Sequence, residues 1–93
     1  MTPITLESRF IISKEALFRD LDGEAVILNL DAGTYYGLNA VGTRMWQLLE
    51  RHGRLKPVFE ELCREYDVAP NDLERDLIAL VGRLAEVGLG RIQ

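Results

Sequence analysis

The 93-residue chain contains a single cysteine and a single histidine, and this scarcity excludes several kinds of chemistry. With Cys63 alone, no internal disulfide can form, which is typical of proteins from a reducing cytoplasm. With His52 alone, no histidine cluster is available to bind a metal ion or to relay protons. We therefore expect a cytoplasmic protein that holds no metal ion and no cofactor.

The chain also lacks long apolar and long basic stretches. No apolar run approaches the ~20 residues that a membrane helix needs, and the N-terminus has no basic segment before an apolar one, as a signal peptide would. The net charge of −4 argues against broad contact with nucleic acid. With 47% hydrophobic and 28% charged residues, the composition predicts one globular domain over residues 1–93 and no membrane partner.

Catalytic signatures are missing as well. The sequence contains no C-x-x-C, H-E-x-x-H or G-x-S-x-G motif and no phosphate-binding loop. His52 falls at the end of a predicted helix, where the helix dipole favours it, and Cys63 lies among apolar neighbours that suit a small core residue. The carboxylates between Glu60 and Asp76 alternate with arginines, as on a solvated helix face. We therefore expect that the protein is not an enzyme.

What the sequence does contain is a series of short strands joined by tight turns. Asp22-Gly23 is a strong two-residue turn signal, so residues 17–21 are predicted to pair with residues 25–30. A second turn over residues 31–33 leads to a strand over residues 34–38. Together these segments predict a three-stranded antiparallel sheet.

The strand over residues 24–30 sets the expected buried face of that sheet. Successive side chains of a strand point to opposite faces, and we expect Val26, Leu28 and Leu30 to lie in one layer with Tyr36 and Leu38. Residues 9–12 are a further strand candidate, and the sequence does not say whether they cover the sheet or pair with another copy.

Three amphipathic helices are predicted after the strands: residues 40–52, a helix that begins near Pro57, and residues 70–87. Asn39 is suited to cap the first helix and Gly53 to end it, while Gly88 is suited to end the last. Three strands followed by three helices define an α+β, winged-helix-like fold.

Two features of this arrangement suggest a binding site. The strand over residues 34–38 leads directly into a helix, so one of its hydrogen-bonding edges stays open, which is either a liability or a peptide-binding site. In addition, the apolar stripe of the last helix is wider than packing against one surface requires. That helix is therefore buried on two sides, or it lends one side to a groove.

The order of the motifs resembles the PqqD-like family of leader-peptide recognition elements. The motifs are D-x-x-T-x-Y-x-L-N at residues 31–39, G-x-x-x-W-x-L-L at 42–49 and L-x-x-x-Y-x-V-x-P at 62–70, followed by Gly88-Leu89. The resemblance covers residues 24–89. Family members usually place a polar N-cap before the proline of the third motif, and Ala69 departs from that pattern.

The resemblance implies that an extended leader segment adds as a strand beside the third strand, with apolar side chains between that strand and the last helix. It places the peptide-binding residues at Thr34, Tyr35, Tyr36, Gly37, Leu38, Leu73, Asp76, Leu77, Leu80 and Val81. Several alternatives stay open. The side chain of Tyr36 points to the same face of the strand as Leu38, so Tyr36 is either a core residue or a binding residue. Gly37 either bends the strand toward the helix or lets another backbone approach closely. Asp76 either anchors a polar or basic group of the leader or is an exposed carboxylate. Val81, together with Ile78, lines the groove or packs against the first helix.

The resemblance also implies partners. The chain lacks the L-L-Y-P-E-G-like segment of the pyrroloquinoline quinone branch, which favours a lasso-peptide pathway with a precursor leader, a leader peptidase and a cyclase as partners. A peptide chaperone of the pyrroloquinoline quinone pathway stays an alternative, as does a homodimer paired through the open edge, so we expect a monomer or a weak homodimer. A winged-helix DNA-binding regulator is the alternative from another class. It is disfavoured because Arg75 and Arg83 are the only basic residues of the last helix, which also carries four carboxylates.

Overall fold

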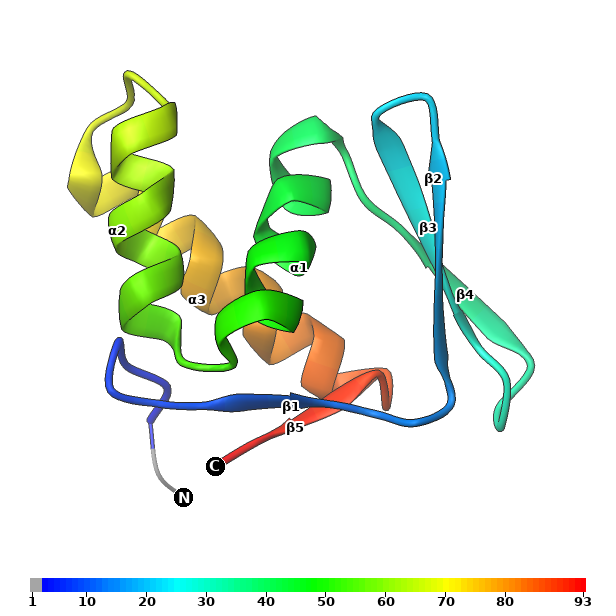
Figure 1. Cartoon of the computed structure of the whole chain (residues 1–93). Coiled ribbons are helices and arrows are strands. Elements are labelled where there is room, and N and C mark those ends of the chain that lie inside the picture. Colours follow the sequence, from blue (N-terminus) through cyan, green and yellow to red (C-terminus); the bar gives the residue numbers. More distant parts are fainter. Residues whose placement is uncertain (1–2) are drawn as a thin grey trace.

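Strands come first along the chain and helices follow in the computed structural model, which describes residues 3–93 (Figure 1). The elements are β1 (Phe10–Ile12), β2 (Ala16–Leu21), β3 (Glu24–Asn29), β4 (Thr34–Gly37), α1 (Ala40–His52), α2 (Leu55–Glu65), α3 (Pro70–Glu86) and β5 (Gly90–Ile92). The expected α+β order of three antiparallel strands before three helices is confirmed. α2 begins two residues earlier than the position of Pro57 predicted.

β2, β3 and β4 form an antiparallel sheet in that order. Ile27 of β3 lies opposite Phe18 of β2 and Tyr36 of β4. At the β2–β3 turn both Asp22 and Gly23 have positive φ, at 62° and 91°, as a two-residue hairpin turn of the primed type requires. The predicted two-residue turn is therefore confirmed, whereas the partner strand of β2 runs over Glu24–Asn29 rather than over residues 25–30.

The predicted buried face of β3 is wrong. Ala25, Ile27 and Asn29 are buried beneath the helices, whereas Val26 and Leu28 are half-buried on the opposite face and Leu30 is exposed. Apolar residues occupy both faces of this strand, so alternation alone did not identify the core side. The polar Asn29 is buried because its side chain is fully used: Oδ1 accepts from the amides of Asp31 and Ala32, and Nδ2 donates to the carbonyl of Val87.

A second, two-stranded sheet joins the two ends of the described chain. β1 pairs antiparallel with β5, with Phe10 opposite Ile92 and Ile12 opposite Gly90. The strand candidate near residue 10 therefore pairs with the C-terminal end of its own chain, a strand that the sequence did not predict. The ring of Phe10 covers Gly90, where any Cβ would overlap it, and meets Trp46 edge-on at 6.5 Å between centroids.

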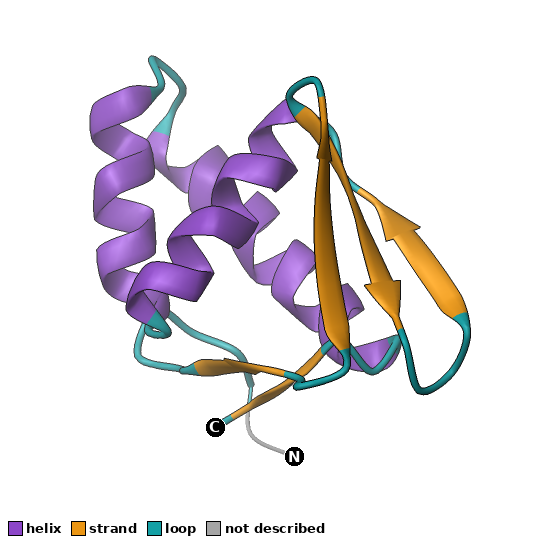
Figure 2. Ribbon diagram, turned by 45° about the vertical axis from the view of Figure 1, so that its right-hand side comes forward, coloured by secondary structure: helices purple, strands orange, loops and turns teal. Residues whose placement is uncertain are grey.

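The three helices pack together on one side of the β2–β3–β4 sheet, and no described helix covers the other side (Figures 1 and 2). α1 touches the sheet most directly, since the Oγ1 of Thr43 accepts a hydrogen bond of 2.8 Å from the amide of Ala25. The core that fills this layer includes Ile27, Trp46, Leu48, Leu62, Leu77 and Leu84. We call the uncovered side the outer face of the sheet.

Helix ends follow the sequence closely. Asn39 caps α1 by accepting a 2.8 Å hydrogen bond from the amide of Gly42, as predicted. Gly53 ends that helix with φ of 74°. Ala69 precedes α3 without a side-chain cap, which matches its departure from the family pattern, and the helix nevertheless begins at Pro70.

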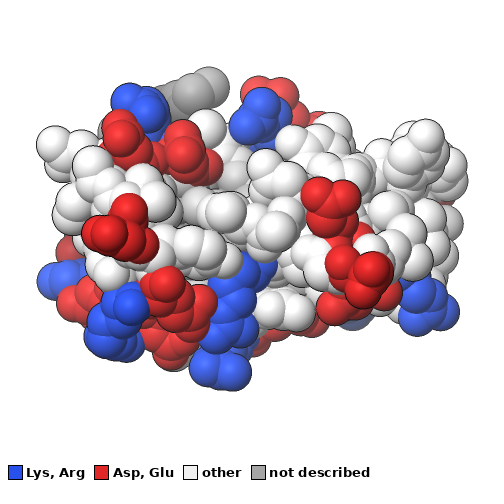
Figure 3. Space-filling view, turned by 90° about the horizontal axis from the view of Figure 1, so that it is seen from above, with Lys and Arg blue, Asp and Glu red and all other residues white. Residues whose placement is uncertain are grey.

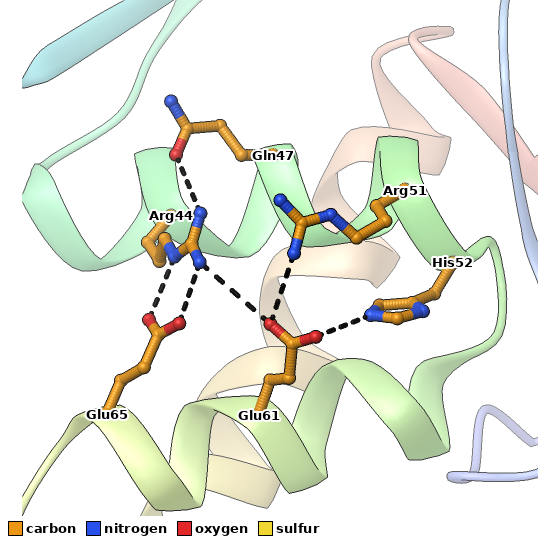
Figure 4. A network of polar contacts seen from close by, with 6 residues as sticks. All are labelled: Arg44, Gln47, Arg51, His52, Glu61 and Glu65. Atoms are coloured by element: carbon orange, nitrogen blue, oxygen red, sulfur yellow. Dashed lines mark hydrogen bonds and ion pairs between the residues drawn. The ribbon is translucent and has the colours of Figure 1, made fainter.

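Ion pairs fasten α1 to α2 on the side away from the sheet (Figure 4). Arg44 donates two hydrogen bonds to Glu65, from Nε at 2.8 Å and from Nη2 at 2.7 Å. Glu61 meets His52 at 3.0 Å and Arg51 at 3.6 Å. The hydrogen bonds from Arg44 lower the pKa of Glu65 below its ordinary value. His52 therefore lies at a helix end, as expected, within a network that holds two helices together.

Candidate functional site: the open edge of β4 and its groove

β4 is an edge strand whose outward hydrogen-bonding groups can be assigned from its register. The amide of Leu38 donates to the carbonyl of Ala25 at 2.8 Å, so Leu38 faces β3. Hydrogen-bonding direction alternates along an antiparallel strand, and Tyr36 and Thr34 therefore also bond toward β3. The N–H and C=O groups of Tyr35 and Gly37 then point to the open edge. These two residues offer two donors and two acceptors to an added strand.

A hollow of about 390 Å³ lies beside the C-terminal end of β4. Its walls come from β4, the start of α1, the segment before α3, and α3 itself. The lining residues are Tyr36, Gly37, Leu38, Asn39, Val41, Gly42, Met45, Tyr66, Val68, Leu73, Asp76, Ala79, Leu80 and Arg83. We call this space the upper hollow, and it lies between the edge strand and the last helix, where the resemblance implied a groove.

A second hollow of about 530 Å³ lies beside the N-terminal end of β4. Its lining combines β4 with the end of α3 and the turn after β3: Ser13, Glu15, Ile27, Asn29, Asp31, Ala32, Thr34, Tyr35, Tyr36, Glu86, Val87, Gly88 and Leu89. We call it the lower hollow. Tyr36 lines both hollows, so the half-buried ring marks where they meet, and the two hollows together make one groove along β4.

The structure brings together most of the residues that the sequence singled out. Thr34, Tyr35, Tyr36, Gly37 and Leu38 all line one or both hollows, and so do Leu73, Asp76 and Leu80. Tyr36 also packs against the core, as expected for a side chain on the same face of the strand as Leu38. The groove therefore has a strand wall and a helix wall.

Leu77 and Val81 do not reach this groove. Both side chains are 0% exposed and line neither hollow. Their stripe of α3 faces the core, and the groove-lining stripe lies to one side of it, at Asp76, Ala79, Leu80 and Arg83. The sequence had left open which flank of α3 faces the groove. The flank of Ile78 packs against the core instead.

Several residues that line the upper hollow were not predicted from the sequence, notably Ala79 and Arg83 on α3 and Tyr66 and Val68 before it. The spacing of 76, 79, 80 and 83 is helical and was available as a signal. It was missed because Ala79 and Arg83 belong to no apolar stripe. Val68 is one of the large apolar side chains that are exposed.

Opposite charges border the upper hollow. Asp76 and Arg83 both line it from α3, and the Asp76 side chain is 64% exposed with only a long contact of 3.9 Å to Arg75. The lower hollow is bordered by Glu15, Asp31 and Glu86. On the side of the molecule seen in Figure 3, basic and acidic side chains are interspersed among uncharged ones. Neither arrangement resembles the concentrated basic surface that binds nucleic acid.

Comparisons with known proteins agree with this geometry. The sequence model of the family described as Coenzyme PQQ synthesis protein D (PqqD) matches residues 24–89, and the chain belongs to that family. The match covers the same residues over which the motifs resemble the family. The comparison with curated proteins found no match.

Two solved structures resemble the chain over most of its length. One, described as TbiB1 in complex with the TbiA(beta) leader peptide, has 40% sequence identity and a TM-score of 0.81, covering 87% of this chain and 94% of that one. The other, described as lasso peptide synthetase B1 complexed with the leader peptide, has 31% identity and a TM-score of 0.79, covering 89% and 98%. Both similar proteins were therefore seen with a leader peptide bound.

Two searches of the described residues concern other kinds of site. No group of three or more His, Cys, Asp or Glu side chains within residues 3–93 is placed to hold a metal ion. None of the helices in the same part of the chain combines the length and apolar character needed to cross a membrane.

Proposed function

We propose that this protein binds the leader segment of a ribosomally made precursor peptide and delivers it to modifying enzymes in lasso peptide biosynthesis. The observation that carries the proposal is the open edge of β4 running along a groove that α3 completes. The identity of 40% and 31% to two proteins solved with leader peptides supports it. The family description alone, which concerns coenzyme PQQ synthesis, would equally suit a chaperone of that pathway.

Recognition would proceed by strand addition. An extended peptide antiparallel to β4 pairs with the outward N–H and C=O groups of Tyr35 and Gly37, and these main-chain bonds set its register. Side chains directly opposite one another lie on the same face of a sheet. The peptide residues opposite Leu38, Tyr36 and Thr34 therefore enter the groove, and they alternate with residues on the outer face.

Specificity would come from the two hollows. In an antiparallel arrangement, the peptide residue opposite Leu38 precedes the one opposite Thr34. The upper hollow then receives the earlier side chain, between apolar walls and the charges of Asp76 and Arg83. The lower hollow receives the later one, near Glu86 and Asp31. Apolar contacts in hollows of this size orient a peptide, and polar groups at their borders select among side chains.

In this proposal the protein performs no chemistry itself, and the peptidase and cyclase act in trans on the peptide it presents. In the same proposal, residues 1–93 form a single recognition domain that works as a monomer or a weak homodimer in the cytoplasm, where precursors are synthesised. A DNA-binding role has no supporting observation in the charge distribution around the groove.

A backbone amide chemical-shift titration with a synthetic lasso-type leader peptide tests the proposal. The expected result is a set of shifts on residues 34–38 and on the α3 flank from Asp76 to Arg83. Shifts centred on α2, or no shifts with leaders of either the lasso or the pyrroloquinoline quinone type, would contradict it. Shifts at the groove with the latter type alone would assign the other pathway.

A further inference from the structure

Two arginines face each other across a short bridge between the N-terminal segment and the start of α2. Arg9 and Arg54 are bridge partners, and backbone hydrogen bonds of 2.8 and 3.1 Å lie on either side of the pair. In such an antiparallel pair the two Cβ atoms are about 5 Å apart and the side chains share one face. Like charges directly opposite each other destabilise the pairing. An anion beside Arg9 and Arg54 would therefore stabilise this bridge.

A third arginine lies on the same face of the neighbouring ribbon formed by β1 and β5. Phe10 and Ile12 pack against the core, so Arg9 and Ile11 point outward together with Arg91, the partner of Ile11. Arg9 and Arg91 are then diagonal neighbours about 7–8 Å apart. All three arginines are exposed. We call Arg9, Arg54 and Arg91 the arginine cluster.

No carboxylate within residues 3–93 forms an ion pair with the arginine cluster. Glu7, the acidic residue closest to Arg9 in the sequence, forms no ion pair either. The start of α2 adds positive potential, because its first turn contains Lys56 and no acidic residue. The cluster contrasts with the net charge of −4 of the whole chain. Its chemistry therefore suits a ligand that carries several carboxylates.

The ribbon connects the lower hollow to the arginine cluster. Ser13 and Leu89 line that hollow, and the amide of Ser13 donates a 3.0 Å hydrogen bond to the carbonyl of Leu89. From there the ribbon runs toward the start of α2 (Figure 1). Arg9 lies four residues before Ser13, and an extended chain of that length spans about 13 Å. A peptide that leaves the lower hollow therefore reaches the cluster within a few residues.

The proposed leader leaves the groove at this hollow. An antiparallel strand beside β4 runs from the Leu38 end to the Thr34 end, so the downstream part of the precursor emerges at the lower hollow. We propose that the arginine cluster binds a run of acidic residues in the precursor, about four to six residues beyond the segment that pairs with β4. This inference rests on the proposed function and adds the chemistry of a second segment of the same peptide.

The border of the lower hollow makes the spacing selective. Glu15, Asp31 and Glu86 line this hollow, and they repel carboxylates that directly follow the paired segment. Carboxylates that lie further downstream pass this border and form ion pairs with Arg91 and Arg9. Precursors with acidic residues at the later positions therefore bind more tightly than precursors with acidic residues at the earlier ones.

Peptides that differ only in their tails test this inference. A synthetic lasso-type leader is extended at its C-terminal end by a flexible Gly-Ser spacer of about four residues and then by a short run of Glu or, in the matched peptide, of Gln. Isothermal titration at low salt should show that the Glu-tailed peptide binds the unaltered protein at least about threefold more tightly. High salt should remove this difference. A Glu run attached without the spacer should give no gain, because it lies beside the acidic border.

Removing two members of the cluster should abolish the preference. Arg9→Gln/Arg54→Gln should bind both tailed peptides as weakly as the unaltered protein binds the Gln-tailed one. Its melting temperature should not fall, because a pair of like charges is removed. The matched control is Arg19→Gln/Arg64→Gln, which removes two exposed arginines that line neither hollow and form no ion pair within the described residues. This control should keep the preference for the Glu tail.

Other outcomes separate the two proposals. Equal affinity of the unaltered protein for the Glu-tailed and Gln-tailed peptides overturns the acidic segment and leaves leader recognition standing. A preference that persists in Arg9→Gln/Arg54→Gln overturns it as well, because the contact then lies elsewhere, and so does a preference lost equally in the control, which reflects net charge alone. If the leader binds with neither tail, the proposed function itself fails. If the double variant is unfolded, Arg91→Gln replaces it under the same criteria.

Discussion

The side chain of Asn29 joins the end of β3 to the end of α3, because its Nδ2 donates a hydrogen bond to the carbonyl oxygen of Val87 at 3.2 Å. The same residue accepts from two amides of the β3–β4 turn through Oδ1. Both Asn29 and Val87 line the lower hollow. One buried amide therefore fixes the strand wall of the groove relative to the helix wall.

Replacing this amide by a carboxylate tests its role. In Asn29→Asp, an acceptor faces the carbonyl of Val87, so we expect a loss of about 2 kcal/mol in the free energy of unfolding at neutral pH. Urea denaturation measures it. The loss should diminish at acidic pH, where a protonated carboxyl can donate again. Asp31→Asn, at an exposed turn position, serves as the control and should stay within about 0.5 kcal/mol of the unaltered protein.

Gly37 offers a sharp test of strand addition. Its N–H points to the open edge, and a Cβ at this position meets only open space. Gly37→Pro removes that donor and should weaken leader binding at least about tenfold, since a proline cannot donate to the added strand. Gly37→Ala keeps the donor and should bind within about threefold of the unaltered protein. Isothermal titration with the leader peptide compares the two variants, and equal affinity of Pro and Ala variants would place the peptide elsewhere.

The helix wall is tested at Ala79, which is exposed and lines the upper hollow. Ala79→Arg fills the groove without disturbing the core, so we expect leader affinity to fall about tenfold while the melting temperature stays unchanged. Asn71→Arg, exposed on the same helix but outside both hollows, is the matched control. Loss of binding in the Asn71 variant would show that the added charge alone weakens leader binding.

Leu77→Arg, by contrast, buries a charge among apolar side chains and should prevent folding.

Turn and cap residues were sufficient to predict several local features of the fold. Asp22-Gly23 fixed the register of the first hairpin, because its positive φ values suit only one kind of turn. Asn39 and Gly53 fixed the ends of α1 for similarly local reasons. The motif order identified the family and hence the groove. The turn and the helix ends, which depend on one or two residues each, were therefore predicted correctly from the sequence.

Where prediction failed, the cause was not local. β3 is apolar on both faces, so its parity pattern could not say that Ile27 is inside and Leu28 outside. β5 was missed because three residues after a helix cap give no periodicity, and the strand is defined by its pairing with the distant β1. The groove flank of α3 depends on where β4 lies in space. These features are decided by tertiary contacts between distant residues.

Gly90 tests the unpredicted pairing of β1 and β5. Its position beneath the ring of Phe10 leaves no room for a Cβ, so Gly90→Ala must displace either the ring or the strand. We expect a loss of about 1–3 kcal/mol in the free energy of unfolding, measured by thermal or urea denaturation. Gly82→Ala is the control, because the same addition there meets only an ordinary contact with Ile4. A Gly90 variant as stable as the control would mean that the two terminal strands separate readily.

The ion pair between Arg44 and Glu65 makes the free energy of unfolding depend on pH. The hydrogen bonds from Arg44 lower the pKa of Glu65, and desolvation opposes them only in part. A lowered pKa in the folded state means that the pair stabilises the fold fully above the ordinary glutamate value of ~4.3 and loses this contribution as the pH falls through the lowered pKa. Glu65→Gln has no carboxylate to protonate, so its stability should fall less steeply than that of the unaltered protein below about pH 4.3.

Urea midpoints measured between neutral and strongly acidic pH compare the two slopes. Glu60→Gln removes an exposed carboxylate of α2 that has no ion pair among the described residues, so this control should keep the slope of the unaltered protein. Because Arg44, Glu61 and Glu65 join α1 to α2 (Figure 4) and line neither hollow, leader affinity of Glu65→Gln at neutral pH should stay unchanged. Identical slopes for Glu65→Gln and the unaltered protein would show that the ion pair does not persist in solution.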